Sequence, residues 1–371
     1  MSSWPDLPIV LYHYDLSPYA RRLVWYLNLR KIPYSQCIQP RILPRPDLAL
    51  LGVSYRRIPV LSIGRDVYLD TRLIIQKLET LYPPSAAHPG ISAKNPEHVA
   101  LEQLISARTI EGDLFQRAIQ CFPPGAFAAD KAFMRDRTAL LTGVDDVHGD
   151  KNKSSNKADN AKNDKNEKKE KLTSAPSPFS PKVMGRNRPA ALTVARRWVR
   201  WLEEGLLADG RTWILDSNAG GAGPSLADIE ATWVLQWIST VLPPEILGSA
   251  PKVAAWMKRF RNAVEEAVRQ VPSIKGEEAA KLIVGSAFAE PEGEILRGDP
   301  FIDAAGLRKG GLVSVSPTDY GFSHRDVGEL VAVDDVEFVI KSKGAFGSVR
   351  IHAPRRGFTI SGVEGSVASK I

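Results

Sequence analysis

The chain has 371 residues, which is enough to bury more than one hydrophobic core. Its hydrophobic fraction of 43% and charged fraction of 25% are those of ordinary soluble proteins, and no apolar run reaches the roughly 18 residues of a membrane-spanning helix. A net charge of +7 could indicate an anionic partner, but much of the excess lysine lies in one low-complexity stretch. Because no nucleic-acid-binding module accompanies the charge, we expect neither a nucleic-acid partner nor a membrane protein.

Cysteine usage and the N-terminus favour a reducing, cytoplasmic location. Cys37 and Cys121 stand far apart with no CxxC motif, and the first residues lack the basic and then apolar pattern of a signal segment. Cys37 falls in a predicted strand, where we interpret it as a buried structural thiol.

The first forty residues predict a strand, a helix and a second strand. Residues 7–12 form a short apolar run that is typical of a buried strand. Ser17 can cap a helix that continues to about Leu29, with Pro18 in its first turn. The helix has a core face of Ala20, Leu23, Val24 and Leu27 at three-to-four spacing, with Arg21 and Arg22 on the other side. The second strand ends near Ile38.

Residues 57–78 predict a strand, a tight turn, another strand and a helix. Proline cannot donate to a sheet ladder, so Pro59 must begin its strand or have a special geometry such as a cis bond, and the peptide of Ile58 then faces outward. Asp70 and Thr71 suit the start of the helix, and helix N-termini bind anions. The order βαβ and then ββα predicts a thioredoxin-like fold.

These residues resemble the thioredoxin-like N-terminal domain of glutathione transferases. That family carries a cis-proline after a hydrophobic residue, as in Ile58-Pro59, and then an acidic-or-Gln plus Ser/Thr pair, as in Asp70-Thr71. Glu or Gln followed by Ser is the more common version of the pair. The resemblance implies that the Ile58 peptide beside Pro59 pairs with the cysteinyl backbone of glutathione, and that Asp70 and Thr71 hold its γ-glutamyl end.

The same resemblance implies that Ser17 is catalytic, since many members carry Ser-Pro or Cys-Pro followed by an aromatic residue, as in Ser17-Pro18-Tyr19. A hydroxyl at a helix N-terminus can donate a hydrogen bond to the glutathione thiolate. Ser17 could instead be only a helix cap, and Tyr12 and Tyr14 are rival hydroxyls. Members with cysteine at this place form mixed disulfides, which requires a thiolate, so thiol transfer is the weaker hypothesis here.

A helical pattern follows the first domain, which we assign to residues 1–88, and extends over residues 89–285. Asn95-Pro96-Glu97 is a strong helix start, and the helix should continue to about Gln120. Residues 145–182 contain mostly Lys, Asn, Asp, Glu and Ser, so we predict a disordered insert there. Helical periodicity returns at residues 188–189.

Ser225 and Asp228 stand three residues apart, as in a capping box with Asp in place of Glu, before an apolar helix. This start resembles the capping motif of the central helix in the C-terminal domain of glutathione transferases, and it implies a structural role. Several tryptophans lie on the helices of this region and should fill its core, although one or two could line an apolar substrate pocket: Trp198, Trp201, Trp233 and Trp237.

Beyond Pro291 the pattern changes to short β-rich runs separated by turns. Their spacing predicts a small barrel or sandwich, which we assign to a third domain of residues 286–371. The transferase family ordinarily lacks this region, and the arrangement looks like a fungal transferase-like group with such a tail. Six scattered histidines without an HxxxH pattern predict no metal site.

We therefore expect an α+β multidomain protein with a thioredoxin-like domain, an all-helical domain and a small β-rich domain. The leading hypothesis is a glutathione transferase-like enzyme that uses glutathione as co-substrate and a hydrophobic electrophile bound between the first two domains. Whether the chain forms a homodimer stays open. The alternative hypothesis is a non-catalytic scaffold that kept the fold and associates with other proteins, because a fold does not imply a function.

Overall fold

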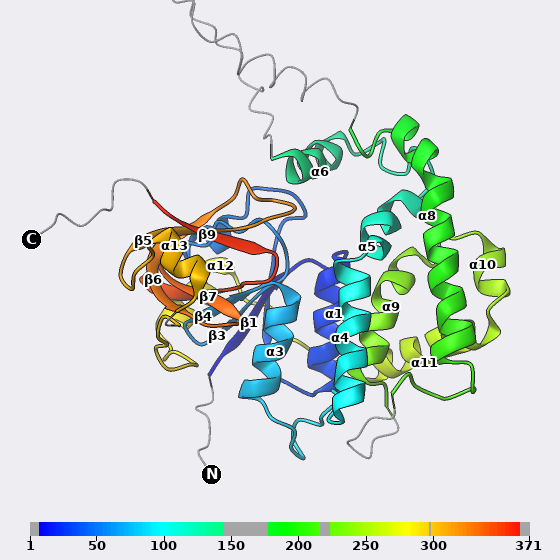
Figure 1. The fold of residues 1–371 in the computed structure, drawn as a ribbon, viewed down its shortest axis with the longest axis horizontal. Helices are drawn as coiled ribbons and strands as arrows, with labels where there is room; N and C mark the ends of the chain where they lie inside the picture. The colour runs from blue at the N-terminus through cyan, green and yellow to red at the C-terminus, as the bar shows by residue number, and fades with distance from the viewer. Residues whose placement is uncertain (1–6, 144–176, 216–222, 297, 364–371) are drawn as a thin grey trace, which may run out of the picture.

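An α/β unit comes first in the computed structural model, which describes residues 7–143, 177–215, 223–296 and 298–363 (Figure 1). β1 pairs in parallel with β2 and antiparallel with β3, and β3 pairs antiparallel with β4. The unit has the predicted thioredoxin-like order: β1 (Ile9–His13), α1 (Pro18–Leu29), β2 (Ser35–Ile38), α2 (Pro46–Ala49), β3 (Val60–Ile63), β4 (Asp66–Leu69) and α3 (Thr71–Leu81).

A helical region follows, as predicted, and packs on the face of the sheet that α1 and α3 cover (Figure 1). Its central helix α9 is buried along most of its length and contacts both α1 and α4. Ser225 and Asp228 form a capping box at the start of α9. The region comprises α4 (Pro96–Ile110), α5 (Asp113–Ala118), the 3-10 helix η1 (Ile119–Cys121), α6 (Lys131–Thr142), α8 (Pro181–Trp201), the π-helix η2 (Leu202–Leu206), α9 (Leu226–Ile238), α10 (Pro244–Gly248) and α11 (Pro251–Glu266).

Two helix boundaries differ from the sequence prediction. α4 ends at Ile110 rather than near Gln120, because the chain turns at Gly112, where a Cβ atom would lie 2.4 Å from the carbonyl oxygen of Arg108. α8 begins at Pro181, with Ser180 as its N-cap. Pro189, near which the sequence pattern predicts the start, lies inside the helix. Of the predicted disordered insert, residues 145–176 lie outside the described residues.

The C-terminal strands continue the first sheet instead of forming a separate one. β8 pairs in parallel with β4, with Val67 beside Ile351, and the strand order becomes β2-β1-β3-β4-β8-β7-β6-β5-β9. The described strands thus form one open sheet, and the expected barrel or sandwich is not found. The elements of this region are α12 (Gly276–Val284), α13 (Pro300–Ala305), β5 (Leu312–Pro317), β6 (Asp326–Val333), β7 (Glu337–Lys343), β8 (Ser348–Pro354) and β9 (Phe358–Gly362).

Two hydrophobic cores lie on opposite faces of the N-terminal strands. Ile9 and Leu11 of β1 join a core with α1, α3 and the helical region, whereas Val10 and Tyr12 join a core with α12 and the C-terminal strands. This division follows from the alternation of side chains along a strand. No helix among the described residues is long and apolar enough to cross a membrane.

Candidate functional site

Three segments of the chain meet at one end of the sheet because of the strand register. Tyr12 of β1 pairs with Val60 of β3, and Val60 pairs with Leu69 of β4. The segment that follows β1, the segment that precedes β3 and the segment that follows β4 therefore lie beside one another. These segments contain the five residues that we predicted to form the site: Ser17, Ile58, Pro59, Asp70 and Thr71.

Ser17 is the N-cap of α1, as its Ser-Pro sequence predicts. Its Oγ accepts a hydrogen bond from the backbone N–H of Ala20 at 3.2 Å, and only 3% of the residue is exposed. No described residue accepts a hydrogen bond from the Ser17 hydroxyl. The hydroxyl proton is thus free to be donated to an anion, which the positive end of the helix dipole would also favour.

The Ile58–Pro59 peptide bond is cis, one of the two geometries that we expected for Pro59. Within the described part of the chain, neither the backbone N–H nor the backbone C=O of Ile58 forms a hydrogen bond. The segment therefore keeps one donor and one acceptor with which an extended peptide could pair, as in strand addition at a sheet edge.

Asp70 is the N-cap of α3 and has a left-handed backbone, with φ of +67°. Its carboxylate accepts hydrogen bonds from the backbone N–H of Arg72 at 3.0 Å and from the Arg72 guanidinium at 2.9 and 2.8 Å. Burial would raise the pKa of Asp70, but these hydrogen bonds and the charge of Arg72 outweigh it and hold the pKa below its usual value. Asp70 is therefore a carboxylate whose charge is already shared with Arg72.

Arg22 positions the Thr71 side chain through a hydrogen bond, a contact that the sequence did not predict. Arg22 is fully buried, donates a hydrogen bond to Thr71 Oγ1 and forms an ion pair with Glu230 of α9. The sequence prediction placed Arg22 with Arg21 on the side of the helix opposite its core face, whereas Arg22 is 1% exposed. Glu230 lies beyond the capping box of the apolar helix α9, where a buried carboxylate needs a cation beside it, so Glu230 was the signal of a buried positive charge. Since Thr71 Oγ1 accepts from Arg22, its own proton is free to point elsewhere.

The C-terminal region holds the loop that carries Ile58 and Pro59. Arg57 donates to the backbone carbonyl of Tyr320 at 2.7 Å and forms an ion pair with Asp319, both in the β5–β6 connection. Asp326 at the start of β6 accepts from the backbone N–H groups of Ser54 and Tyr55 at 2.6 and 3.2 Å. Burial raises the pKa of Asp326 to about 7 despite these two hydrogen bonds. No sequence signal linked these distant segments.

The rival hydroxyls and the thiols are placed less favourably than Ser17. Tyr12 is buried in the core, and burial raises the pKa of its phenol. The Tyr14 hydroxyl accepts a hydrogen bond from Arg137 of α6 at 3.1 Å. Cys37 is buried as expected, and burial together with Asp47 raises the pKa of its thiol to about 12. A thiol with that pKa is protonated at neutral pH and is a poor nucleophile.

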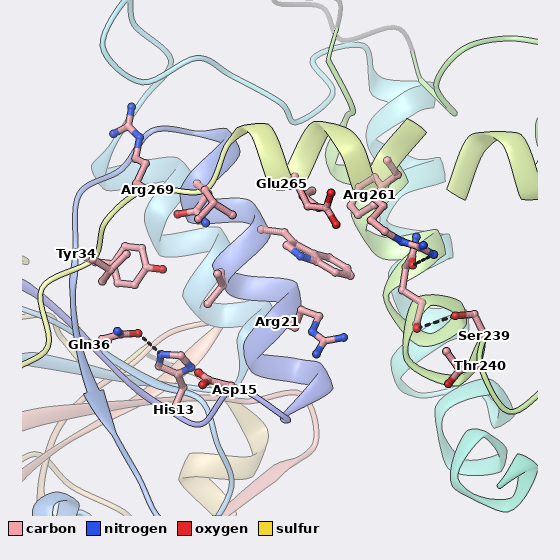
Figure 2. A pocket seen from close by; sticks show the side chains of 18 residues that line it. His13, Asp15, Arg21, Tyr34, Gln36, Ser239, Thr240, Arg261, Glu265 and Arg269 are labelled. Carbon is pink, nitrogen blue, oxygen red and sulfur yellow. Dashed lines mark hydrogen bonds between the residues drawn. The ribbon is translucent and has the colours of Figure 1, made fainter. Parts of the chain in front are cut away.

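A cavity of about 580 Å³ lies on another side of α1, between α1, β2 and α11 (Figure 2). The side chains at its base include His13 and Gln36, which are joined by a hydrogen bond of 3.1 Å between His13 Nε2 and Gln36 Oε1. Ser17, Ile58 and Thr71 do not line this cavity. It is therefore distinct from the set of residues that we predicted.

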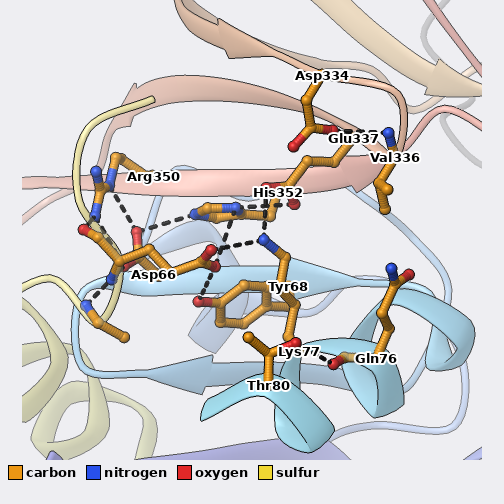
Figure 3. A network of polar contacts seen from close by, with 12 residues as sticks. Asp66, Tyr68, Gln76, Lys77, Thr80, Asp334, Val336, Glu337, Arg350 and His352 are labelled. Atoms are coloured by element: carbon orange, nitrogen blue, oxygen red, sulfur yellow. Dashed lines mark hydrogen bonds and ion pairs between the residues drawn. The ribbon is translucent and has the colours of Figure 1, made fainter. Parts of the chain in front are cut away.

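A buried ionic network joins β4 to the C-terminal strands (Figure 3). His352 on β8 contacts Asp66 Oδ1 through Nε2 at 3.0 Å and Glu337 Oε2 through Nδ1 at 3.1 Å, so both ring nitrogens face carboxylates. Burial alone would lower the pKa of His352, but the two carboxylates raise it to about 9. The network also contains further ion pairs at 2.7 Å between Arg350 and Asp66, Lys77 and Glu290, and Lys77 and Glu337.

Glu290, Glu337 and His352 have ligand atoms within 4.8 Å of one another, which is close enough to hold a metal ion. Both carboxylates already bind Lys77, however, and Glu290 also accepts from the Tyr68 hydroxyl at 2.7 Å. The charges of the network are thus compensated by protein groups, and we interpret it as structural.

Comparisons with known proteins give two family matches. Residues 11–86 match the glutathione S-transferase N-terminal domain, and residues 156–269 match a domain of unknown function, DUF7962. No curated protein matches the chain.

Among solved structures, the chain is similar to a glutathione S-transferase-like protein from Pseudomonas syringae, with 20% identity, a TM-score of 0.58, and coverage of 96% of this chain and 99% of that chain. It is also similar to a glutathione transferase from Bombyx mori, with 15% identity, a TM-score of 0.41 and coverage of 76% and 99%. Human glutathione S-transferase T1-1 in its apo form is similar with 17% identity and a TM-score of 0.43, and the match covers 76% of this chain and 93% of that chain. The first likeness shows a shared fold over nearly the whole chain. The protein is thus glutathione S-transferase-like in its N-terminal domain and its fold, while the predicted fungal type stays a prediction.

Proposed function

We propose that the chain binds glutathione at the end of the sheet where Ser17, Ile58 and Thr71 meet, and conjugates it through its sulfur to a hydrophobic electrophile. The observation that carries the proposal is the free backbone of Ile58, which lies at the same end of the sheet as the segment after β1 and has no hydrogen-bonding partner in the described residues. A tripeptide with a thiol in its middle residue matches this edge, because its cysteinyl backbone can pair with Ile58 while its thiol lies near Ser17.

The γ-glutamyl end would lie at the start of α3. Its carboxylate accepts from the Thr71 hydroxyl, whose proton is free because Arg22 donates to Thr71 Oγ1. Its ammonium group pairs with Asp70, which shares its charge with Arg72. Helix N-termini favour a carboxylate in the same way, through their unpaired N–H groups.

Ser17 would stabilise the reacting sulfur. When the thiol loses its proton to water, the Ser17 hydroxyl donates a hydrogen bond to the thiolate, and the helix dipole of α1 adds to this stabilisation. The thiolate then attacks the electrophilic carbon, a carbon–sulfur bond forms, and the leaving group departs with the bonding electron pair. The electrophile would lie between the N-terminal domain, which we assign to residues 1–88, and the helical domain, which we assign to residues 89–285.

Calorimetric titration with glutathione and a conjugation assay with 1-chloro-2,4-dinitrobenzene test the proposal. We expect Ser17→Ala to retain glutathione affinity and to lose about 10²-fold in kcat, as when one donor to a developing anion is removed. Ser180→Ala is the matched control, since Ser180 is also a helix cap followed by proline, at the start of α8. Absence of glutathione binding, or equal kcat for Ser17→Ala and wild type, would reject the proposal.

The second candidate function is a non-catalytic scaffold. Ser17 and Thr71 are each 3% exposed and Ile58 is 8% exposed, so little of the site reaches solvent. A scaffold predicts a folded protein that ignores glutathione and associates with itself or with other chains. The same titration separates the two functions, because only the transferase binds glutathione.

A further inference from the structure

The cavity between α1, β2 and α11 has the size and lining of a small-molecule site. Its volume of about 580 Å³ falls within the range of roughly 300–1,000 Å³ of ligand pockets. One wall is apolar, with Val24 and Trp25 from α1 facing Phe260 and Val264 from α11. Trp25 packs edge-on against Phe260, with ring centroids 5.1 Å apart, so its indole is held in place. An aromatic ring would find a fixed apolar surface here.

The rim of the cavity carries guanidinium groups without a carboxylate partner. Arg21 on α1 and Arg261 on α11 lie on different walls, and Arg269 lies towards another end (Figure 2). In the part of the chain that the structure describes, none of the three forms an ion pair with Asp or Glu within 4.0 Å. Arg261 donates to Gln236 Oε1 and Arg269 to the Lys31 carbonyl, each at 3.3 Å, which leaves most of their N–H groups free. Asp15 and Glu265 also line the cavity, so its three guanidinium groups exceed its carboxylates by one. Because neither carboxylate pairs with Arg21 or Arg261, these two guanidinium groups favour a carboxylate ligand.

The lining of the cavity contains two buried polar atoms that the protein leaves unsatisfied. His13 Nδ1 and Asn28 Oδ1 have no hydrogen-bonding partner among the described residues, although the two residues are only 4% and 5% exposed. Natural proteins pair nearly all buried polar atoms, so each exception calls for an explanation, such as a group that binds there. Two such atoms in the lining of one cavity therefore point to a ligand rather than to simple packing.

We propose that this cavity binds an aromatic monocarboxylate, with its ring against Trp25 and its carboxylate held by Arg21 and Arg261. The site is separate from the proposed glutathione site, because Ser17, Ile58 and Thr71 do not line it. Its occupant therefore binds independently of glutathione.

Titration of the full-length protein with 2-naphthoate, followed by isothermal calorimetry, tests the proposal. The neutral isostere 2-naphthamide keeps the ring and the shape but lacks the charge. We expect one 2-naphthoate per chain and at least tenfold weaker binding of the amide, because charge-assisted hydrogen bonds to two guanidinium groups are lost. Saturating glutathione should leave the affinity for 2-naphthoate unchanged.

Variants locate the binding. Arg21→Gln combined with Arg261→Gln should weaken 2-naphthoate binding about tenfold and leave the fold intact, since both side chains are exposed. The matched control combines Arg196→Gln with Lys258→Gln, which removes the same charge from exposed helix positions outside the cavity. No binding of 2-naphthoate, equal affinity for the amide, equal loss in both double variants, or competition by glutathione would each overturn the proposal. Ser17→Ala should bind 2-naphthoate like the wild type, so failure of the glutathione proposal leaves this one intact.

Discussion

Replacing His352 by glutamine removes the positive charge that joins Asp66 and Glu337, and we expect the cost to depend on pH. Both ring nitrogens face carboxylates at 3.0 and 3.1 Å, so the folded state binds the imidazolium form. Near pH 6, removing one member of a buried ion pair should lower the free energy of unfolding by about 3–5 kcal/mol. Glutamine fits the space in part and stays neutral, which isolates the effect of charge.

The pH dependence follows from the pKa of His352, which the network raises from 6.5 to about 9. At about 1.4 kcal/mol for each pKa unit, this rise is worth about 3 kcal/mol of stability. Because the folded-state pKa lies above the unfolded value, this contribution is complete below the unfolded pKa of 6.5 and is lost as pH rises through 9.

Urea denaturation followed by circular dichroism measures the effect in wild type and His352→Gln, at about pH 6 and again above the raised pKa. The difference in unfolding free energy between the two proteins should shrink by about 3 kcal/mol at the higher pH. His98→Gln on α4 is the control and should show no such change. The same difference at both pH values would refute the reasoning, since it would mean that His352 is neutral in the fold.

Other substitutions test separate contacts. In wild type, the raised pKa of Asp326 makes the folded state hold a proton, so stability should fall by about 4 kcal/mol as pH rises from about 4 to above 7. Asp326→Asn should remove this loss and flatten the dependence of the unfolding free energy on pH in urea denaturation. An equally steep dependence in the variant would contradict the prediction. Arg22→Met should lower the free energy of unfolding by about 3–5 kcal/mol, because it leaves Glu230 buried without a partner. The double variant Arg22→Met with Glu230→Leu should recover most of this stability in thermal denaturation, and a double variant as unstable as Arg22→Met would argue against the ion pair. Ser225→Ala should cost on the order of 1 kcal/mol in urea denaturation, and no loss would mean that the cap contributes nothing.

Local patterns predicted the elements that local chemistry determines. The Ser-Pro start of α1, the cis peptide bond before Pro59 and the capping box at Ser225 all depend on residues within a few positions of one another. The candidate site followed from these patterns because strand register brings their ends together.

Contacts between distant segments were not predictable from one sequence. The pairing of β4 with β8 and the ion pair of Asp66 with Arg350 join residues 284 positions apart, and the periodicity of either strand is the same in a separate barrel. Arg22 and Glu230 are 208 positions apart, so Glu230 can indicate that a buried cation lies beside it but not which residue supplies that cation. The residues that hold the Ile58 loop, such as Asp326, were missed for the same reason.

The pairing of β4 with β8 also has a consequence for how the protein is made. During translation, β4 leaves the ribosome long before β8 is synthesised, so the edge of β4 that pairs with β8 is at first unpaired. Asp66 is then also without its partners Arg350 and His352, which have not yet been synthesised. Bare strand edges invite pairing with other chains. Shortened versions that stop before β8 should therefore aggregate during expression, and biochemical work on the first domain needs the last strands as well.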